Sequence, residues 1–431
     1  MQVSTNRGAL EPPLSLHSAD PSVSRSSADI LPGRPVLMIC HSYYEEDARI
    51  RREAAALRAD GREVDVVSLR VPDSPADALV DGVRVHRISV QHVQGRSLTG
   101  YMGEYLSFLI RASVMATRLH RRRRYGLVQV HTLPDFLVFA ALPLRLTGVP
   151  VVLDLHEAMP PFFRTRFKKL DRPFLVRCLE LVERASIGAA DAAITVNAAL
   201  RDRLIAKGVP AGKVSVLLNS PDLALFDALA HPKRAFAEDG VLRLVYAGSL
   251  TPLYDVESII QAVALLATGG DGREPLGASV SLDIYGRGDS ERRLREIVAQ
   301  RGLEGQVRFH GRVPVETIAG RIAAADVGVA PTRPDGYTHL SMSTKLFEYG
   351  AMGKPVLASR LATVERYFGP DSLAYFDAGD PASAAVSLRR LMSDAGWRER
   401  IVASASDRIA QFSWDGEADR YRTLIRRMAR R

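Results

Sequence analysis

Short hydrophobic runs alternate along this chain with longer stretches in which apolar residues recur every three or four positions. A short apolar run between turn residues is typical of a buried strand, and the longer spacing is typical of an amphipathic helix. Residues 36–40 begin the pattern, and a helix follows with Asp47 as its expected N-cap and Gly61 as its end. The further strands expected in this series are 64–67, 127–130, 151–155 and 193–196, and the further helices are 134–146 and 173–189.

A second series of the same kind follows in the other half of the chain. Its expected strands are 242–246, 279–285, 307–310, 327–330 and 355–358, with a helix between successive strands. Regular alternation of strand and helix predicts an α/β protein with doubly wound parallel sheets. Two such halves form a cleft between the carboxyl ends of their strands, which is where open parallel sheets bind ligands.

The interruptions in this pattern give the expected domain organisation. Residues 1–34 contain Ser, Pro and Asp but no apolar segment of a secretory signal, so we expect a disordered tail. Residues 35–222 form the first domain, residues 223–240 the linker and residues 241–412 the second domain. Residues 413–431 are expected to form a basic terminal helix, which can cross back to the first domain.

Composition narrows the class of protein and its partners. Hydrophobic residues make up 46% of the 431 residues and charged residues 25%, which is typical of a soluble globular protein. The two cysteines, Cys40 and Cys178, fall in an expected strand and helix, which favours reduced thiols and a cytoplasmic location. The net charge of +9 suits anionic partners such as nucleotide diphosphates or lipid headgroups. Nucleic acid is not expected, because the arginines are spread and no aromatic stacking module is visible.

Residues 341–356 form the most informative segment for chemistry. Ser343 or Thr344 can cap a short helix there, whose free N–H groups and positive dipole end suit a diphosphate. Lys345 and Glu348 are three residues apart and share a helix face. A carboxylate at that place can accept two hydrogen bonds from a ribose diol. The alternative is an exposed Lys–Glu pair worth a few tenths of a kcal/mol.

This segment resembles the donor-binding segment of the retaining glycosyltransferases of family 4, which often reads close to "PTKLFEYMAMGKPVVAS". Residues 47–53 resemble that family's "DxRVRRE" pattern, and residues 216–223 resemble its "VIPNGVDL". Residues 307–311 and 325–331 also fit, so the resemblance extends from about Pro35 to the C-terminus. It implies the GT-B architecture of two Rossmann-like domains facing a cleft, with a nucleotide diphosphate sugar as donor substrate and no cofactor.

The resemblance assigns the donor-binding residues. Glu348 matches the second glutamate of the family's E-x7-E motif, which holds the nucleotide ribose, whereas Leu340 stands at the place of the first. The family's "GRLxxxKG" loop, whose Arg and Lys clamp the diphosphate, reads GSLTPLYD from Gly248 onward. Both cations are missing, so other groups are expected to compensate. These are Lys345, Ser249, the helix N–H groups near Thr344 and Arg287, for which a cation in a surface turn is the alternative.

Residues at the ends of the first domain's strands are candidates for the chemistry. His156 follows the strand 151–155 and resembles the family histidine near the reacting sugar, and Glu157 is an acid/base or acceptor-binding candidate. A structural role for a single histidine is the alternative. After the first strand, His41, Glu45 and Glu46 can reach the same cleft from the acceptor side, or remain solvated loop residues.

The implied reaction moves a hexose-type sugar from the nucleotide diphosphate to a hydroxyl acceptor in polysaccharide or glycoconjugate assembly. No carboxylate is clearly placed as a nucleophile, which favours a front-face mechanism with retention. No Asp-x-Asp pair is present, so no metal is expected. Two alternatives stay open: a nucleotide-sugar epimerase on the same fold, and a non-catalytic donor-binding protein. A nicotinamide oxidoreductase lacks support, because no Gly-x-Gly-x-x-Gly follows the first strand.

Residues 101–124 predict an amphipathic helix that ends in four arginines. Such a helix can lie on an anionic membrane surface, which would bring the enzyme to a lipid-linked sugar acceptor at the inner face of the plasma membrane. The alternative is a helix packed on the core, whose arginines complement its dipole. No apolar run approaches the roughly 18 residues of a membrane span.

Overall fold

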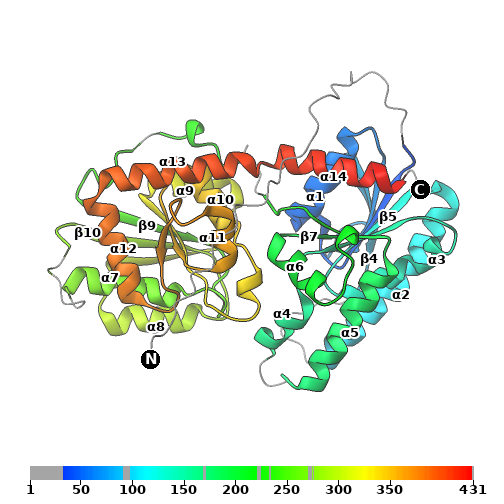
Figure 1. Ribbon diagram of the computed structural model, residues 1–431, viewed down its shortest axis with the longest axis horizontal. Coiled ribbons are helices and arrows are strands. Elements are labelled where there is room, and N and C mark those ends of the chain that lie inside the picture. Colours follow the sequence, from blue (N-terminus) through cyan, green and yellow to red (C-terminus); the bar gives the residue numbers. More distant parts are fainter. Residues whose placement is uncertain are drawn as a thin grey trace, which may run out of the picture.

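The computed structural model describes residues 33–90, 98–167, 171–220, 225–232, 234–269, 274 and 276–429, so nearly all of the predicted tail 1–34 lies outside the described residues. The chain forms two α/β units side by side (Figure 1). The first sheet has the order β3 (Asp77–Val80), β4 (Val83–Ile88), β2 (Val64–Leu69), β1 (Val36–Cys40), β5 (Leu127–His131), β6 (Val151–Leu155), β7 (Ala192–Thr195), β8 (Val214–Val216). The second has the order β11 (Val307–Gly311), β10 (Ser279–Tyr285), β9 (Val241–Ala247), β12 (Val327–Ala330), β13 (Val356–Ser359), β14 (Ala374–Phe376).

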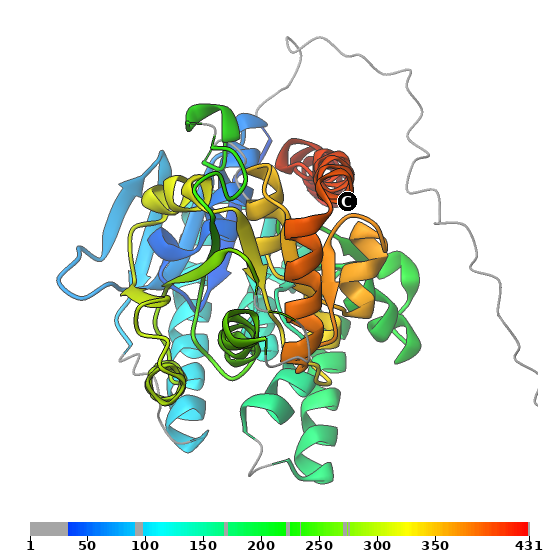
Figure 2. The same ribbon diagram turned by 90° about the vertical axis from the view of Figure 1, so that its left-hand side faces the viewer.

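Both sheets are covered by helices, and the predicted architecture of two Rossmann-like domains is confirmed (Figures 1 and 2). The helices of the first unit are η1 (Tyr44–Glu46), α1 (Ala48–Ala59), α2 (Leu98–Arg123), η2 (Asp135–Ala141), α3 (Leu142–Arg145), α4 (Met159–Arg166), α5 (Pro173–Ala189), α6 (Ala198–Ala206) and η4 (Ala211–Lys213). Those that follow are η5 (Ala228–Ala230), α7 (Val256–Thr268), α8 (Glu291–Arg301), α9 (Val315–Ala324), η6 (Thr338–Leu340), α10 (Lys345–Ala351), α11 (Ala362–Phe368), α12 (Pro381–Ser393), α13 (Ala395–Gln411) and α14 (Trp414–Ala429).

Burial explains why the strands read as continuous apolar runs. Every residue of β1, β2, β5 and β6 is buried, as expected for parallel strands with helices on both faces. The antiparallel pair of β3 and β4 lies at one edge of the first sheet, where exposed and covered residues alternate. The predicted N-cap is also present, because the Asp47 carboxylate accepts a hydrogen bond from the N–H of Ile50 at 3.2 Å.

One predicted helix, 134–146, is divided in the structure. Its first part is the 3-10 helix η2, and its second part is the single turn α3. Pro143 lies in the first turn of α3, where its missing N–H is tolerated, but it cannot donate the bond that would continue a helix from η2. The prediction of one continuous helix was therefore wrong.

The C-terminal helix joins the two units. α13 covers the second unit, and α14 continues across the gap onto α1 and β5 of the first, which Figure 1 shows in red along one edge of the molecule. The Tyr421 hydroxyl donates to Gln129 Oε1 at 2.6 Å, and the N–H of Leu218 donates to Glu417 Oε2 at 2.9 Å. Among the described helices, none has the length and hydrophobicity needed to cross a bilayer.

Candidate active site

Two adjoining cavities lie between the two units, at the carboxyl ends of their strands. The smaller, of about 360 Å³, has walls from both units, including Asn197 and Ser249. The larger, of about 970 Å³, is lined mainly by the first unit, together with Glu348 and residues near the start of α9. The two share His156, Glu157 and Thr344, so a ligand can extend from one cavity into the other.

Most of the predicted site residues line one of these cavities. The smaller cavity is lined by Ser249, Leu340, Thr344, Lys345, His156 and Glu157, and the larger by His41, Glu46, Thr344, Glu348, His156 and Glu157.

Three predicted residues do not line either cavity. Glu45 binds Arg87 of β4, a partner far away in sequence. Arg287 is exposed, and its guanidinium lies near Gly311. Gly248 is in contact with the end of the Lys345 side chain, and its missing side chain leaves room for that lysine.

Lys345 is buried in the wall of the smaller cavity, with 7% of its surface exposed. Its Nζ lies 4.1 Å from the ring centre of Tyr254 and 5.4 Å from that of Tyr246. No carboxylate lies within ion-pair distance of it among the described residues. The alternative of an exposed Lys345–Glu348 pair is therefore wrong. A buried ammonium with aromatic neighbours and no carboxylate at ion-pair distance is suited to binding an anionic ligand.

Close packing of two glycine loops makes room for this lysine. A Cβ on Gly248 would lie 2.3 Å from Cε of Lys345, and one on Gly286 would lie 1.8 Å from the oxygen of Gly248. The N–H of Gly248 donates to the carbonyl of Tyr285 at 2.8 Å, which ties the loop after β9 to the end of β10. A side chain at position 286 would collide with the backbone of Gly248, whereas one at position 248 would displace the end of the Lys345 side chain.

A buried ionic network holds His156 at the end of β6. The Asp154 carboxylate accepts hydrogen bonds from Nε and Nη2 of Arg49 at 3.0 and 2.9 Å. Nε2 of His156 and Nδ1 of His131 lie 3.1 and 3.2 Å from Asp154 Oδ2. Burial alone would raise the pKa of Asp154, but Arg49 and the two histidines hold it well below its usual range. Burial lowers the pKa of His131 and favours its neutral form.

The same three residues offer ligand-type atoms within 4.8 Å of one another. Both oxygens of Asp154 already receive the Arg49 guanidinium, however, so a metal ion there would lie beside a fixed positive charge. The donor set therefore fits an ion-paired positioning network better than a cation site.

Comparison with known families identifies the chain. Residues 47–220 match the model of the glycosyl transferase 4-like domain, and residues 242–394 match that of the glycosyl transferases group 1. The chain belongs to this glycosyltransferase family, with the GT-B fold.

Relatives cover nearly the whole glycosyltransferase. A D-inositol 3-phosphate glycosyltransferase of Thermomonospora curvata is 25% identical over 388 residues, which are 85% of this chain and 86% of the relative. Sucrose-phosphate synthase from Thermosynechococcus elongatus has a TM-score of 0.73 at 18% identity and covers 92% of this chain and 99% of that one. Anabaena HepE in complex with UDP and glucose has a TM-score of 0.64 at 15% identity, with coverage of 91% and 99%.

Two carboxyl groups that line the cavities of the glycosyltransferase have pKa values above their usual range. Burial raises the pKa of Glu157 to about 7, against the lowering effect of His156. Burial also raises the pKa of Glu348, against the lowering effects of Lys345, Thr344 and Arg52. A carboxyl group with a pKa near 7 can give or accept a proton at neutral pH.

Sequence reasoning missed several residues that shape the site. Asn197 Nδ2 donates to the carbonyl of Leu340 at 2.7 Å and so connects the two domains across the smaller cavity. Arg52 donates to Asn219 Oδ1 at 2.6 Å in the wall of the larger cavity. Asn197 lies two residues after β7 and directly after the predicted strand 193–196, so its position was an available signal.

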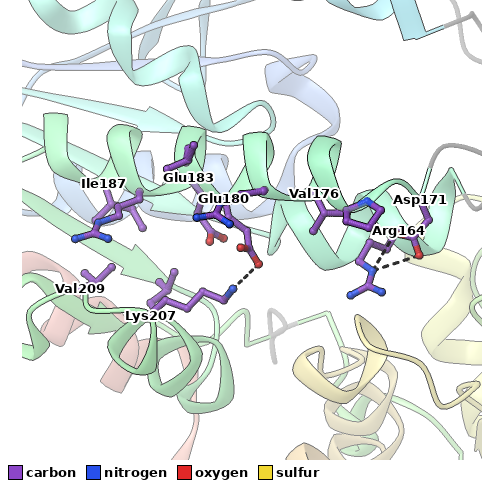
Figure 3. A pocket seen from close by; sticks show the side chains of 13 residues that line it. Arg164, Asp171, Val176, Glu180, Glu183, Ile187, Lys207 and Val209 are labelled. Carbon is purple, nitrogen blue, oxygen red and sulfur yellow. Dashed lines mark hydrogen bonds and ion pairs between the residues drawn. The ribbon is translucent and has the colours of Figure 1, made fainter.

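A third cavity, of about 600 Å³, lies on the first domain beside α5 and the end of α6 (Figure 3). It contains ion pairs between Arg164 and Asp171 and between Lys207 and Glu180. None of the predicted site residues lines it. All the residues that line it belong to the first domain, so it does not lie between the two units.

Asp135 provides a test of stability in the first domain. Burial raises its pKa to about 8, and neither carboxyl oxygen has a hydrogen-bond partner among the described residues. A proton is thus bound more tightly in the folded state than in the unfolded state, so stability falls as pH rises from about 4 to about 8, by on the order of 3–5 kcal/mol. Asp135→Asn should remove most of this slope in denaturant titrations at pH 5 and pH 8.5, whereas exposed Asp371→Asn should keep it. An unchanged slope in Asp135→Asn would contradict the assignment.

Proposed function

We propose that this glycosyltransferase moves a hexose from a nucleotide diphosphate sugar to a hydroxyl group of a sugar-containing acceptor, with retention of anomeric configuration. The observation that carries the proposal is the buried Lys345 ammonium, which has no carboxylate within ion-pair distance among the described residues and lines a cavity next to His156 and Glu157. A diphosphate is the anion that this reaction requires at that place.

The donor class has support from neighbouring structures. HepE was solved with UDP and glucose, and a trehalose-6-phosphate enzyme of E. coli with UDP-2-fluoro glucose. Here Lys345 would contact the diphosphate, and Glu348 would accept hydrogen bonds from the ribose diol. Thr344 lines both cavities.

The proposed chemistry breaks the anomeric C–O bond as the nucleotide diphosphate leaves. The sugar gains oxocarbenium character, and the charge that develops on the leaving phosphate oxygen is stabilised by Lys345. The acceptor hydroxyl attacks from the same face, and its proton passes to the leaving oxygen. His156 and Glu157, which line both cavities, would bind sugar hydroxyls around the reacting carbon. Because Lys345 supplies the positive charge, no metal step is needed.

Assembly of a polysaccharide or glycoconjugate is the setting that fits best. An O-antigen chain mannosyltransferase B of E. coli is 28% identical over 171 residues, which are 40% of this chain. The larger cavity has the volume for a sugar acceptor beside the donor cavity.

Glu348→Ala is expected to weaken binding of the donor about tenfold to a hundredfold and to leave the fold intact, because two hydrogen bonds to the ribose are lost. Calorimetric titration with the donor measures this loss. Glu365→Ala, an acidic residue of α11 outside both cavities, is the control and should bind the donor as the wild type does. Unchanged affinity in Glu348→Ala would remove the ribose assignment.

The function itself is tested by incubating the enzyme with a panel of nucleotide diphosphate sugars and sugar acceptors, in buffer containing EDTA. Proton NMR of the product gives the anomeric configuration. A glycoside with the configuration of the donor supports the proposal. Inversion, dependence on added metal, or conversion of the donor sugar without an acceptor would overturn it.

A further inference from the structure

The long helix α2 has an apolar stripe on its solvent side. Met102, Leu106, Ile110 and Val114 follow one another at intervals of four residues and are 40%, 48%, 61% and 46% exposed. The opposite side of the helix is packed in the core through Phe108, Ala112 and Ala116. The residues that hold α2 on the domain are therefore not the residues of the stripe, and the stripe is available for a partner.

Positive charge continues the stripe toward the C-terminal end of α2. Arg118, Arg121, Arg122 and Arg124 are exposed, and none has an acidic partner among the described residues. Arg123, by contrast, is paired with Glu63 and Asp65. An apolar strip that merges into unpaired guanidinium groups suits a surface with hydrocarbon beneath anionic headgroups.

We propose that the stripe and these four arginines dock the protein on an anionic phospholipid surface. A second copy of the chain is a poorer occupant, because a two-fold contact through the stripe would bring two sets of unpaired arginines together. Residues 101–124 were expected either to lie on a membrane surface or to pack on the core. In this proposal the helix does both, since one side packs on the core and the other faces the lipid.

The position of α2 connects this surface to the proposed site. Glu104, near the start of α2, lies 3.1 Å from Nε2 of His41, and the ring of Tyr105 lies 4.9 Å from the His41 ring. His41 in turn lines the larger cavity. Docking through α2 thus brings the acceptor cavity next to the lipid surface, which selects an acceptor sugar carried on a lipid. This step rests on the proposed function, whereas the docking itself does not.

Sedimentation of the full chain with vesicles tests the docking. We expect binding to vesicles that contain phosphatidylglycerol and at least tenfold weaker binding to pure phosphatidylcholine. Each basic residue near an anionic surface strengthens binding about fivefold, so the variant with Arg118, Arg121 and Arg122 all changed to Gln should bind about a hundredfold more weakly. Leu106→Ser combined with Ile110→Ser should weaken binding at least tenfold.

Matched controls use exposed residues elsewhere. The change of Arg292, Arg295 and Arg301 on α8 to Gln removes the same charge, and Leu229→Ser with Val386→Ser removes similar exposed apolar surface. Both controls should bind vesicles as the wild type does. Equal binding to neutral vesicles, or wild-type binding by the α2 variants, would overturn the proposal. The proposal would also be overturned if light scattering showed that the wild type is a dimer and that the Leu106 and Ile110 changes dissociate it.

A second readout separates this proposal from the proposed function. Thermal shift with nucleotide diphosphate sugars, measured without vesicles, should be the same for the wild type and the α2 variants. Vesicle binding without any donor binding would reject sugar transfer and support the docking surface. Sugar transfer to a soluble acceptor without vesicle binding would support the function and reject the docking surface.

Discussion

Replacing Lys345 with methionine is expected to lower kcat/KM for sugar transfer by about two to three orders of magnitude. Methionine keeps the unbranched shape and most of the length of the side chain, but removes the charge that would stabilise the leaving diphosphate. Because the interaction strengthens as charge develops, kcat should fall as well as donor affinity. Steady-state kinetics with the donor identified in the panel measures both.

Lys354 is the matched control for this variant. It belongs to the same segment, but its Nζ donates to the carbonyl of Ala323 at 2.7 Å, and it lines neither cavity. Lys354→Met should keep the wild-type kcat and KM, with at most a small loss of stability. Equal losses of activity in the two variants would show that the effect of Lys345 is not specific to the site.

Arg49→Met should destabilise the first domain by about 3–5 kcal/mol, which corresponds to a fall of roughly 10 °C in its unfolding midpoint. The change leaves the buried carboxylate of Asp154 and the neighbouring carboxyl group of Glu53, whose pKa burial and Asp154 already raise, without their cation. In the variant these groups bind protons more tightly when folded than when unfolded, so the loss should be larger at pH 8 than at pH 5. Thermal unfolding at the two pH values measures it.

Two further variants isolate the buried network. Arg51 is on the same helix as Arg49 and forms an exposed ion pair with Asp81. Arg51→Met should therefore lower the free energy of unfolding by less than about 1 kcal/mol. Arg49→Met combined with Asp154→Leu should recover part of the stability that Arg49→Met loses, because one unpaired carboxylate is then absent. Fully additive losses in the double variant would contradict a coupled network.

The sequence predicts the two sheets well because parallel strands are buried on both faces and therefore read as plain apolar runs. Residues 36–40 match β1, where each residue is buried. The edge hairpin of β3 and β4 lacks that signal, since one face of each strand is in contact with solvent. The surface on which the terminal helix packs could not be predicted from local sequence either, because Tyr421 forms its hydrogen bond with Gln129, which is 292 residues away in the chain.

The site shows the same division between local and distant information. Lys345 and Glu348 could be singled out because their segment has a recognisable order of residues, although they line different cavities. The bond of Glu45 to Arg87 depends on how the hairpin folds back, which no local pattern contains. Asp154 did carry a signal, because a carboxylate inside the apolar strand 151–155 requires a buried partner. The identity of that partner, Arg49, required the fold.

Binding of the donor diphosphate by Lys345 is the interaction on which the proposed function depends. The most direct measurement compares the affinities of nucleoside diphosphates and the corresponding monophosphates for the wild type and Lys345→Met, by calorimetry across the common bases. We expect the wild type to bind the diphosphate at least tenfold more tightly, and Lys345→Met to lose most of this preference while binding the monophosphate as before. If Lys345→Met kept the wild-type preference, the diphosphate would lie elsewhere and the proposed role of Lys345 would be wrong.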